Sequence, residues 1–215
     1  MRIHTLSTGV PETRSDERGE WTSAIHRQPV MGPVMLTERG HADDRVANRK
    51  YHGSPDQAVC AHPLEHYAFW NAEYGTDLFG PAVLGENWTL SDANEANTYI
   101  GDVYRAGQAV VQVSAPRVPC STQERRVQLA GFLRRSNETQ RTGWYLRVLT
   151  PGEVSAGDAL VLLSRPARAH TVAQVNENFH GRFDPGFAEE LLLAPELAEA
   201  WKEMLRKRLG QVRQA

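Results

Sequence analysis

Residues 108–120 run Gln-Ala-Val-Val-Gln-Val-Ser-Ala-Pro-Arg-Val-Pro-Cys, and this stretch decides how the chain is folded. Its first half is an apolar run typical of a strand, and Pro116 and Pro119 end that strand because proline fixes φ and lacks a backbone donor. Cys120 then stands on a rigid corner that can hold its thiol still and exposed. Arg117, three residues earlier, can stabilise a thiolate or bind a phosphate or another anion. A buried structural cysteine is the alternative, but this context favours a reactive thiol.

Similar apolar runs recur along the chain as far as Pro166. They include residues 58–61 and 144–149, and a run at 159–163 that we expect to be buried on both faces. Glycine, proline, asparagine and aspartate separate them, as in a β-rich domain. Many short strands in about 165 residues favour a closed or nearly closed β-barrel.

Helical periodicity occurs at one place inside this region and dominates after it. Residues 63–74 predict a helix with Pro63 at its first position and Gly75 at its end. After Pro166, Thr171, the pair Asp184-Pro185 and Pro195 each predict the start of a helix. The sequence therefore predicts a mainly β fold with a few helices: a barrel domain over 1–165 and a three-helix C-terminal extension over 166–215.

The composition is that of an ordinary globular protein. Of the 215 residues, 40% are hydrophobic and 23% are charged, and the formal net charge is −2. No concentrated basic charge favours a nucleic acid or an anionic membrane, and no apolar run is long enough to span a bilayer. The N-terminus lacks the apolar core of a signal peptide, so we expect a cytoplasmic protein. Two cysteines are too few for a disulfide framework or an iron–sulfur cluster.

Two other polar motifs are candidates for ligand binding. Residues 51–56, Tyr-His-Gly-Ser-Pro-Asp, place His52 beside Gly53, and a series of backbone amides there would suit a phosphate. A plain turn explains this motif at least as well. Residues 85–89, Gly-Glu-Asn-Trp-Thr, offer side chains that can hydrogen-bond a heterocycle, although a loop explains them almost as well.

Other kinds of site fit the sequence less well. His62-Pro-Leu-Glu-His66 matches the H-x-x-E-H pattern of one class of zinc peptidases, but Pro63 leaves His62 outside the predicted helix. A capping residue and a half-buried histidine are therefore favoured over a metal site. The glycine-rich motifs of nucleotide-binding folds and the G-x-S-x-G of hydrolases are missing. A pyridoxal-phosphate aldimine would have to form on Lys50, because the other two lysines lie in the last predicted helix.

In this order, these motifs resemble the MOSC domain, named for the C-terminus of molybdenum cofactor sulfurase. The resemblance rests on four motifs and extends from about residue 24 to residue 209: His52-Gly53-x-x-Asp56, Gly85-Glu86-Asn87, Ile100-Gly101-Asp102 and Pro116-Arg117-x-Pro119-Cys120. The tail after Pro166 is similar to the three-helix extension of the bacterial branch that includes the 6-N-hydroxylaminopurine resistance proteins. The family is also associated with pyridoxal phosphate binding.

The resemblance implies a β-barrel that binds the molybdenum cofactor (molybdopterin). Cys120 would be the catalytic residue and the thiolate ligand of molybdenum, since a soft metal favours sulfur. The pocket would be lined by His52, Gly53, Asp56, Glu86, Asn87 and Arg117. Arg117 would contact the phosphate of the cofactor, and Glu86 and Asn87 its pterin.

Three residues depart from the family pattern. Ser54 and Asp43 stand where the family usually has glycine, and a side chain there would oppose a positive φ. Trp88 follows Asn87 where a smaller aliphatic residue is common.

The resemblance implies a molybdenum-dependent oxidoreductase that reduces N-hydroxylated bases or similar small molecules. The chain has no flavin fold, haem motif or cluster, so a separate reductase would supply the electrons. Two alternatives stay open: a carrier of persulfide sulfur or of cofactor that uses Cys120, and a barrel that has lost cofactor binding. The oligomeric state is not predicted.

Overall fold

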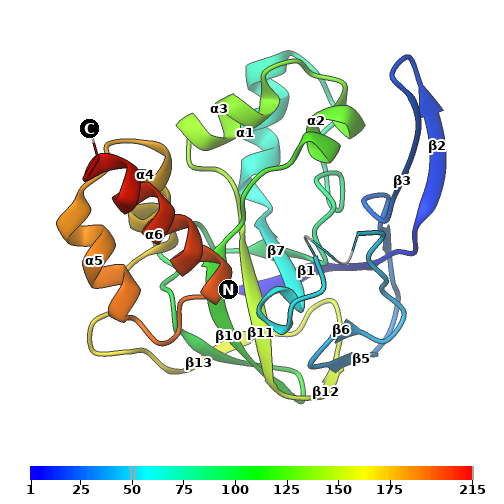
Figure 1. The fold of residues 1–215 in the computed structure, drawn as a ribbon. Coiled ribbons are helices and arrows are strands. Elements are labelled where there is room, and N and C mark those ends of the chain that lie inside the picture. The colour runs from blue at the N-terminus through cyan, green and yellow to red at the C-terminus, as the bar shows by residue number, and fades with distance from the viewer. Residues whose placement is uncertain (49, 51, 215) are drawn as a thin grey trace.

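The computed structural model describes residues 1–48, 50 and 52–214 and shows a curled β-sheet with helices on two sides (Figure 1). Eight strands form the main sheet in the order β13-β9-β10-β11-β7-β8-β1-β4, and every neighbouring pair is antiparallel except β7 and β8. The eight strands are β1 (Arg2–Thr8), β4 (Gln28–Pro29), β7 (Val59–Pro63), β8 (Trp88–Ser91), β9 (Val103–Ala106), β10 (Ala109–Pro116), β11 (Trp144–Thr150) and β13 (Leu160–Ser164).

Main-chain hydrogen bonds join the start of β1 to the residues around the start of β13. The amide of Ile3 donates to the carbonyl of Asp158 (2.9 Å), and the amide of Leu160 donates to that of Met1 (3.1 Å). These bonds link β13, at one end of the sheet, to β1, the second strand from the other end. The predicted barrel of short strands is therefore confirmed.

Two small sheets flank the barrel. One has the order β12-β5-β6, with β12 (Gly152–Val154), β5 (Val34–Thr37) and β6 (Gly40–His41). The other is a hairpin of β2 (Glu12–Asp16) and β3 (Gly19–Ser23), which projects on the side opposite the C-terminal helices (Figure 1).

The apolar runs at 58–61, 108–113 and 144–149 lie in or overlap β7, β10 and β11. The expected burial of residues 159–163 is wrong. Leu160 is buried, but Val161, Leu162 and Leu163 are 44%, 46% and 51% exposed. Within the described residues β13 pairs along its length with β9 alone, so it is an edge strand, and its side chains after Leu160 are exposed on both faces.

The first helix starts later than the sequence predicts. Pro63 is the last residue of β7 and pairs with Leu90 of β8, and α1 (Glu65–Tyr74) begins after Leu64. A parallel strand partner holds Pro63 in extended backbone, which overrides its preference for a first helical turn. Gly75 ends α1 with φ 60°, as predicted.

Two short helices were not predicted. They are α2 (Ser121–Val127) and α3 (Phe132–Glu138), and a 3-10 turn, η1 (Pro55–Gln57), lies before β7. With α1 and the following loop they enclose a second apolar cluster, in which the rings of Trp70 and Phe132 lie 5.1 Å apart. This cluster covers one end of the barrel.

The three C-terminal helices are α4 (Val172–His180), α5 (Pro185–Leu193) and α6 (Glu199–Val212). Thr171 and Asp184 cap the first two helices, as predicted. Pro195 does not open the third, which begins after Ala198. Apolar side chains of all three helices belong to the same core cluster as the barrel strands.

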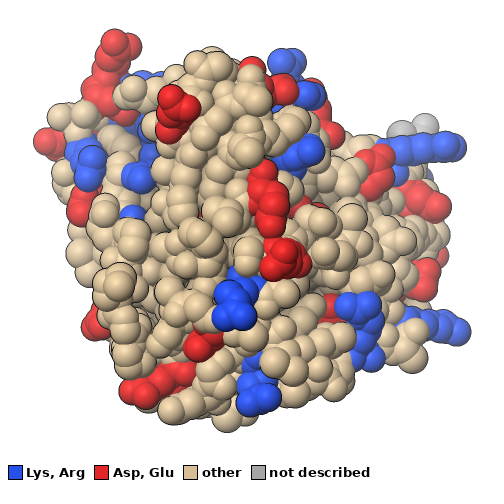
Figure 2. All heavy atoms as spheres, turned by 180° about the vertical axis from the view of Figure 1, so that it is seen from behind, with Lys and Arg blue, Asp and Glu red and all other residues tan. Residues whose placement is uncertain are grey.

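Charge is mixed on the face seen in Figure 2, where Lys and Arg are interspersed with Asp and Glu. Among the described residues, no helix is both long enough and apolar enough to cross a membrane.

Candidate functional site

Cys120 lies where the sequence places it, at the end of the segment that leaves β10. It is the N-cap residue of α2 and is partly exposed. Its amide donates to Oε1 of Gln123 (3.1 Å), whose Nε2 donates in turn to the carbonyl of Leu84 (3.3 Å). These contacts fix the backbone that carries the thiol. Cys120-x-x-Gln123 is a variant of the capping-box pattern, which is the signal in the sequence that could have revealed α2.

Arg117 is buried behind this thiol, with only 6% of its surface exposed. Its Nη2 donates to the carbonyl of Leu84 (2.7 Å), whereas its Nη1 is buried without a hydrogen-bond partner among the described residues. Burial alone lowers the pKa of Arg117, but nearby acidic groups, first Cys60 and Tyr145, raise it overall. The guanidinium therefore stays charged, with one donor group unused.

Glu86 is fully buried beside this guanidinium. Its Oε1 accepts hydrogen bonds from the hydroxyl of Tyr67, the amide of Ala82 (2.6 Å) and Oγ1 of Thr89 (2.8 Å). Its Oε2 is buried with no partner in the described part of the chain. Burial and then the charge of Glu86 raise the pKa of Tyr67 well above its usual value, so the Tyr67 hydroxyl keeps its proton.

Three successive loop carbonyls before Glu86 are each held by an arginine. The carbonyl of Val83 accepts from Nε of Arg126 (2.6 Å), that of Leu84 from Arg117, and that of Gly85 from Nη1 of Arg27 (2.6 Å). These bonds place three guanidinium groups along the loop, of which Arg27 is also paired with Asp44 (2.7 Å). Burial, and then the charges of Arg117 and Arg27, lower the pKa of His52.

The structure therefore brings together four of the predicted site residues: Cys120, Arg117, Glu86 and His52. It also adds Cys60 and Tyr145, which face each other in register across β7 and β11 and interact electrostatically with Arg117. Cys60 is 5% exposed and burial raises the pKa of its thiol, so of the two thiols only Cys120 is available for reaction.

The other predicted residues make contacts within the fold. The Asn87 side chain accepts from the amide of Cys60 (3.1 Å) and donates to the carbonyl of Ser7 (3.3 Å), which ties β7 to β1. Asp56 forms an ion pair with Arg147 (2.8 Å). Gly53 supplies a turn with φ 92°, and Tyr51 lies outside the described residues.

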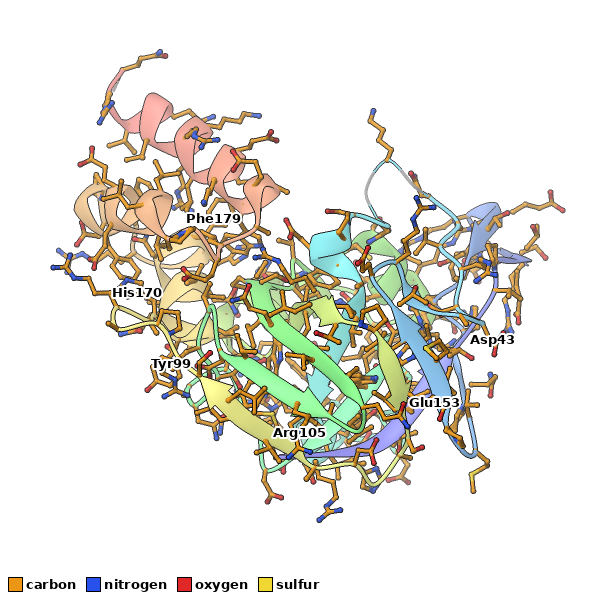
Figure 3. The ribbon with its side chains drawn as sticks, turned by 90° about the horizontal axis from the view of Figure 1, so that it is seen from below. Asp43, Tyr99, Arg105, Glu153, His170 and Phe179 are labelled. Carbon is orange, nitrogen blue, oxygen red and sulfur yellow. The ribbon has the colours of Figure 1, made fainter. Side chains whose placement is uncertain are left out.

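The three departures from the family pattern do not disturb the backbone of the site. Ser54 has φ −63°, and its hydroxyl accepts from the amide of Asp56 to cap η1. Asp43 is exposed at the outer rim of the molecule and has no positive φ (Figure 3). Trp88 is fully buried in the barrel and donates from Nε1 to Nε2 of His41 (2.9 Å).

The H-x-x-E-H motif is divided between two elements. His62 lies in β7 and is fully buried, whereas His66 lies in α1 and pairs with Glu95 (2.7 Å). Within residues 1–48, 50 and 52–214, no group of three His, Cys, Asp or Glu side chains is placed to hold a metal ion.

Comparisons with known proteins show which proteins this chain is similar to. The model of the MOSC domain family matches residues 48–161. The chain is 36% identical to the Escherichia coli protein YiiM, over 86% of this chain and 84% of that protein. It is 36% identical to the uncharacterized Bacillus subtilis protein YflK, over 96% and 93% of the two chains.

A fungal relative from Gibberella moniliformis, named "Reductase", is 36% identical over 76% of this chain, but the match covers only 30% of that protein. Among solved structures, YiiM from Geobacillus stearothermophilus superposes with a TM-score of 0.81 at 33% identity, covering 97% of this chain and 98% of that one. YiiM from Escherichia coli gives 0.80 at 31% identity, covering 98% and 94%.

Proposed function

The chain belongs to the MOSC domain family, and we propose that it holds a molybdenum cofactor at Cys120 and reduces N-hydroxylated bases or related N-hydroxylated compounds. One observation carries the proposal. A partly exposed thiol stands beside a buried cation and a buried carboxyl group that each have an atom without a partner in the described part of the chain, Nη1 of Arg117 and Oε2 of Glu86. Buried polar atoms are rarely left unpaired, and a bound ligand or an ordered water can complete them.

The donor set fits the cofactor. The sulfur of Cys120 is a soft thiolate, the same type of donor as the dithiolene sulfurs through which the cofactor holds its molybdenum. Nη1 of Arg117 can bind the phosphate of the cofactor, because a guanidinium forms strong charge-assisted hydrogen bonds with phosphate oxygens. His52 adds hydrogen-bonding capacity on the same side, whereas Arg27 is already paired with Asp44 (2.7 Å) and with the carbonyl of Gly85.

The reaction converts R–NHOH, two protons and two electrons into R–NH2 and water, with cleavage of the N–O bond. The bound cofactor would supply the two-electron chemistry. Cys120 would hold the cofactor by its sulfur, and Arg117 would orient it by its phosphate. The Tyr67 hydroxyl keeps its proton and donates a hydrogen bond to Oε1 of Glu86, which leaves Oε2 of Glu86 to accept a hydrogen bond from the ligand.

The electrons would come from a separate reductase. Two cysteines, one of them buried, cannot form an iron–sulfur cluster. The fungal relative named "Reductase" extends far beyond the part that this chain matches. In that longer relative the rest of the chain would account for the supply of electrons, and for the present protein a separate partner would do so.

The test uses protein expressed in a host that makes the cofactor. We expect stoichiometric molybdenum, and reduction of 6-hydroxylaminopurine when a chemical reductant is added. Cys120→Ala should lose both, whereas the matched variant Cys60→Ala should keep most of both. Full activity in Cys120→Ala would contradict the proposed mechanism.

The partial exposure of Cys120 also fits a sulfur carrier, since a persulfide must be reached by its acceptor. The same preparations decide between the two functions. Labile sulfur on Cys120 without molybdenum would support the carrier and reject the reductase.

A further inference from the structure

The end of β10 loses one of its two neighbouring strands, β9, just before the site and stays paired with β11. β9 pairs with β10 from Ala109 to Gln112, and the β10–β11 register shifts between Val113 and Ala115. The carbonyls of Ser114 and Pro116 then need other donors, because buried backbone groups are almost always paired. Both residues are buried.

The last helix supplies those donors. The amide of Ala198, the N-cap of α6, donates to the carbonyl of Ser114 (2.9 Å). Nε1 of Trp201 donates to the carbonyl of Pro116 (2.9 Å). Trp201 is 3% exposed, and its ring packs against that of Phe179 on α4, with the centroids 5.1 Å apart. Figure 3 shows Phe179 between α4 and the last helix.

The carbonyl of Pro116 and the amide of Arg117 belong to one peptide group, and this group is held from both sides. The indole of Trp201 binds its oxygen, and its N–H donates to the carbonyl of Gly143 (3.0 Å). α4 supports the second contact, because Nδ2 of Asn176 donates to Oγ1 of Thr142, directly before Gly143 (2.8 Å). A planar peptide fixed at both polar atoms cannot turn about the strand axis.

We propose that Trp201 is a positioning residue for the site: its hydrogen bond to the Pro116–Arg117 peptide sets the direction of the Arg117 side chain and of the segment that ends at Cys120. The three C-terminal helices are then part of the site's framework. The clamp itself follows from the contacts of this chain, and only the identity of the ligand rests on the proposed function.

The direct test is amide hydrogen exchange in cofactor-free protein carrying Trp201→Phe, which keeps an aromatic ring and removes the N–H. Losing one hydrogen bond should speed exchange of the Arg117 amide about two- to tenfold beyond any global change. The matched control is Leu209→Ala, two helical turns or about 12 Å further along α6, which removes apolar packing from a buried position. It should speed exchange only as far as it lowers global stability.

Two further measurements at the candidate ligand site complete the test. Trp201→Phe should weaken binding of inorganic phosphate by a similar factor and change the rate at which iodoacetamide modifies Cys120, and Leu209→Ala should do neither. Exchange at Arg117 no faster than in the control would overturn the clamp. If the unsubstituted protein binds no phosphate, the proposed function loses its anion site while the exchange data still decide the clamp. If Trp201→Phe does not fold, benzothienylalanine at position 201 keeps the ring shape and still removes the N–H.

Discussion

Replacing Arg117 with methionine should separate ligand binding from stability. In the cofactor-free protein the guanidinium is buried with an unpaired Nη1, and the Leu84 carbonyl that it binds also accepts from Gln123 (3.3 Å). Methionine therefore leaves that carbonyl paired and removes a buried charge that is costly to desolvate. Such replacements are often neutral or stabilising, so we expect the free energy of unfolding to stay within about 1 kcal/mol.

The loss should appear in anion binding. A hydrogen bond to a charged group contributes about 1.5–3 kcal/mol. Since about 1.4 kcal/mol corresponds to a factor of ten, Arg117→Met should weaken binding of inorganic phosphate about 10- to 150-fold. Isothermal titration calorimetry measures the affinity, and urea unfolding measures the stability.

Arg165→Met is the matched control. Arg165 makes two bonds to the fully buried carboxylate of Asp102, of 2.6 Å and 2.8 Å. Without Arg165, the hydroxyl of Tyr104 is the remaining side-chain donor to that carboxylate among the described residues. Arg165→Met should therefore lower the free energy of unfolding by about 2 kcal/mol and leave the affinity for phosphate unchanged. The reasoning fails if Arg117→Met unfolds as the control does, or if it binds phosphate as the unsubstituted protein does.

Three further predictions use other features of the structure. Burial is the first cause that lowers the pKa of His41, to about 4. Between about pH 6.5 and 4 the unfolded chain therefore binds a proton at His41 that the folded chain does not, and this should lower the free energy of unfolding by about 3 kcal/mol as the pH drops through that range. Urea unfolding at several pH values should show a smaller fall for His41→Gln. Iodoacetamide should modify only Cys120 in the native protein, because Cys60 is buried, and modification of Cys60 before unfolding, seen by peptide mass spectrometry, would be the contrary result. Gly143→Ala places a Cβ 2.3 Å from a carbonyl oxygen of β7 and should lower the free energy of unfolding by about 3 kcal/mol. Gly131 has a similar positive φ but open space around it, so Gly131→Ala should lower it by about 1 kcal/mol. Equal losses of stability in urea unfolding would refute the steric argument.

Local signals account for the parts of the fold that the sequence predicted. Thr171 and Asp184 cap helices because their side chains bond to the next few amides, a property that needs no tertiary context. The burial predicted for residues 159–163 was wrong for the opposite reason. Its apolar pattern predicts burial, but what covers a strand depends on segments far along the chain.

Contacts with distant residues also explain why the short helices were not predicted. α2 has seven residues and buries only Gln123 and Val127, too few apolar positions to produce a helical period. Its stability comes from reciprocal capping and from the bond between Gln123 and Leu84. The capping pattern was visible in the sequence, but that carbonyl was not.

The site shows the same division. Cys120 and Arg117 were predicted because prolines fix their backbone within five residues. Cys60 and Tyr145 reach Arg117 only through strand register, since they face each other across β7 and β11. An alternation pattern does not give the register between two distant strands.

Hydrogen bonding divides the family's motif residues into two groups with different tasks. Asn87 has partners in the protein for both ends of its amide, and Asp56 is paired with Arg147, so these residues hold the frame. Nη2 of Arg117 and Oε1 of Glu86 are hydrogen-bonded within the protein, whereas Nη1 of Arg117 and Oε2 of Glu86 are buried and unpaired in the described structure. An unpaired buried atom alone does not mark a ligand-binding residue, because Asn176, which supports the Arg117 peptide, also has an unpaired buried Oδ1. The ligand site is identified by the combination: the unpaired atoms of Arg117 and Glu86 belong to the same set of motifs as the partly exposed Cys120.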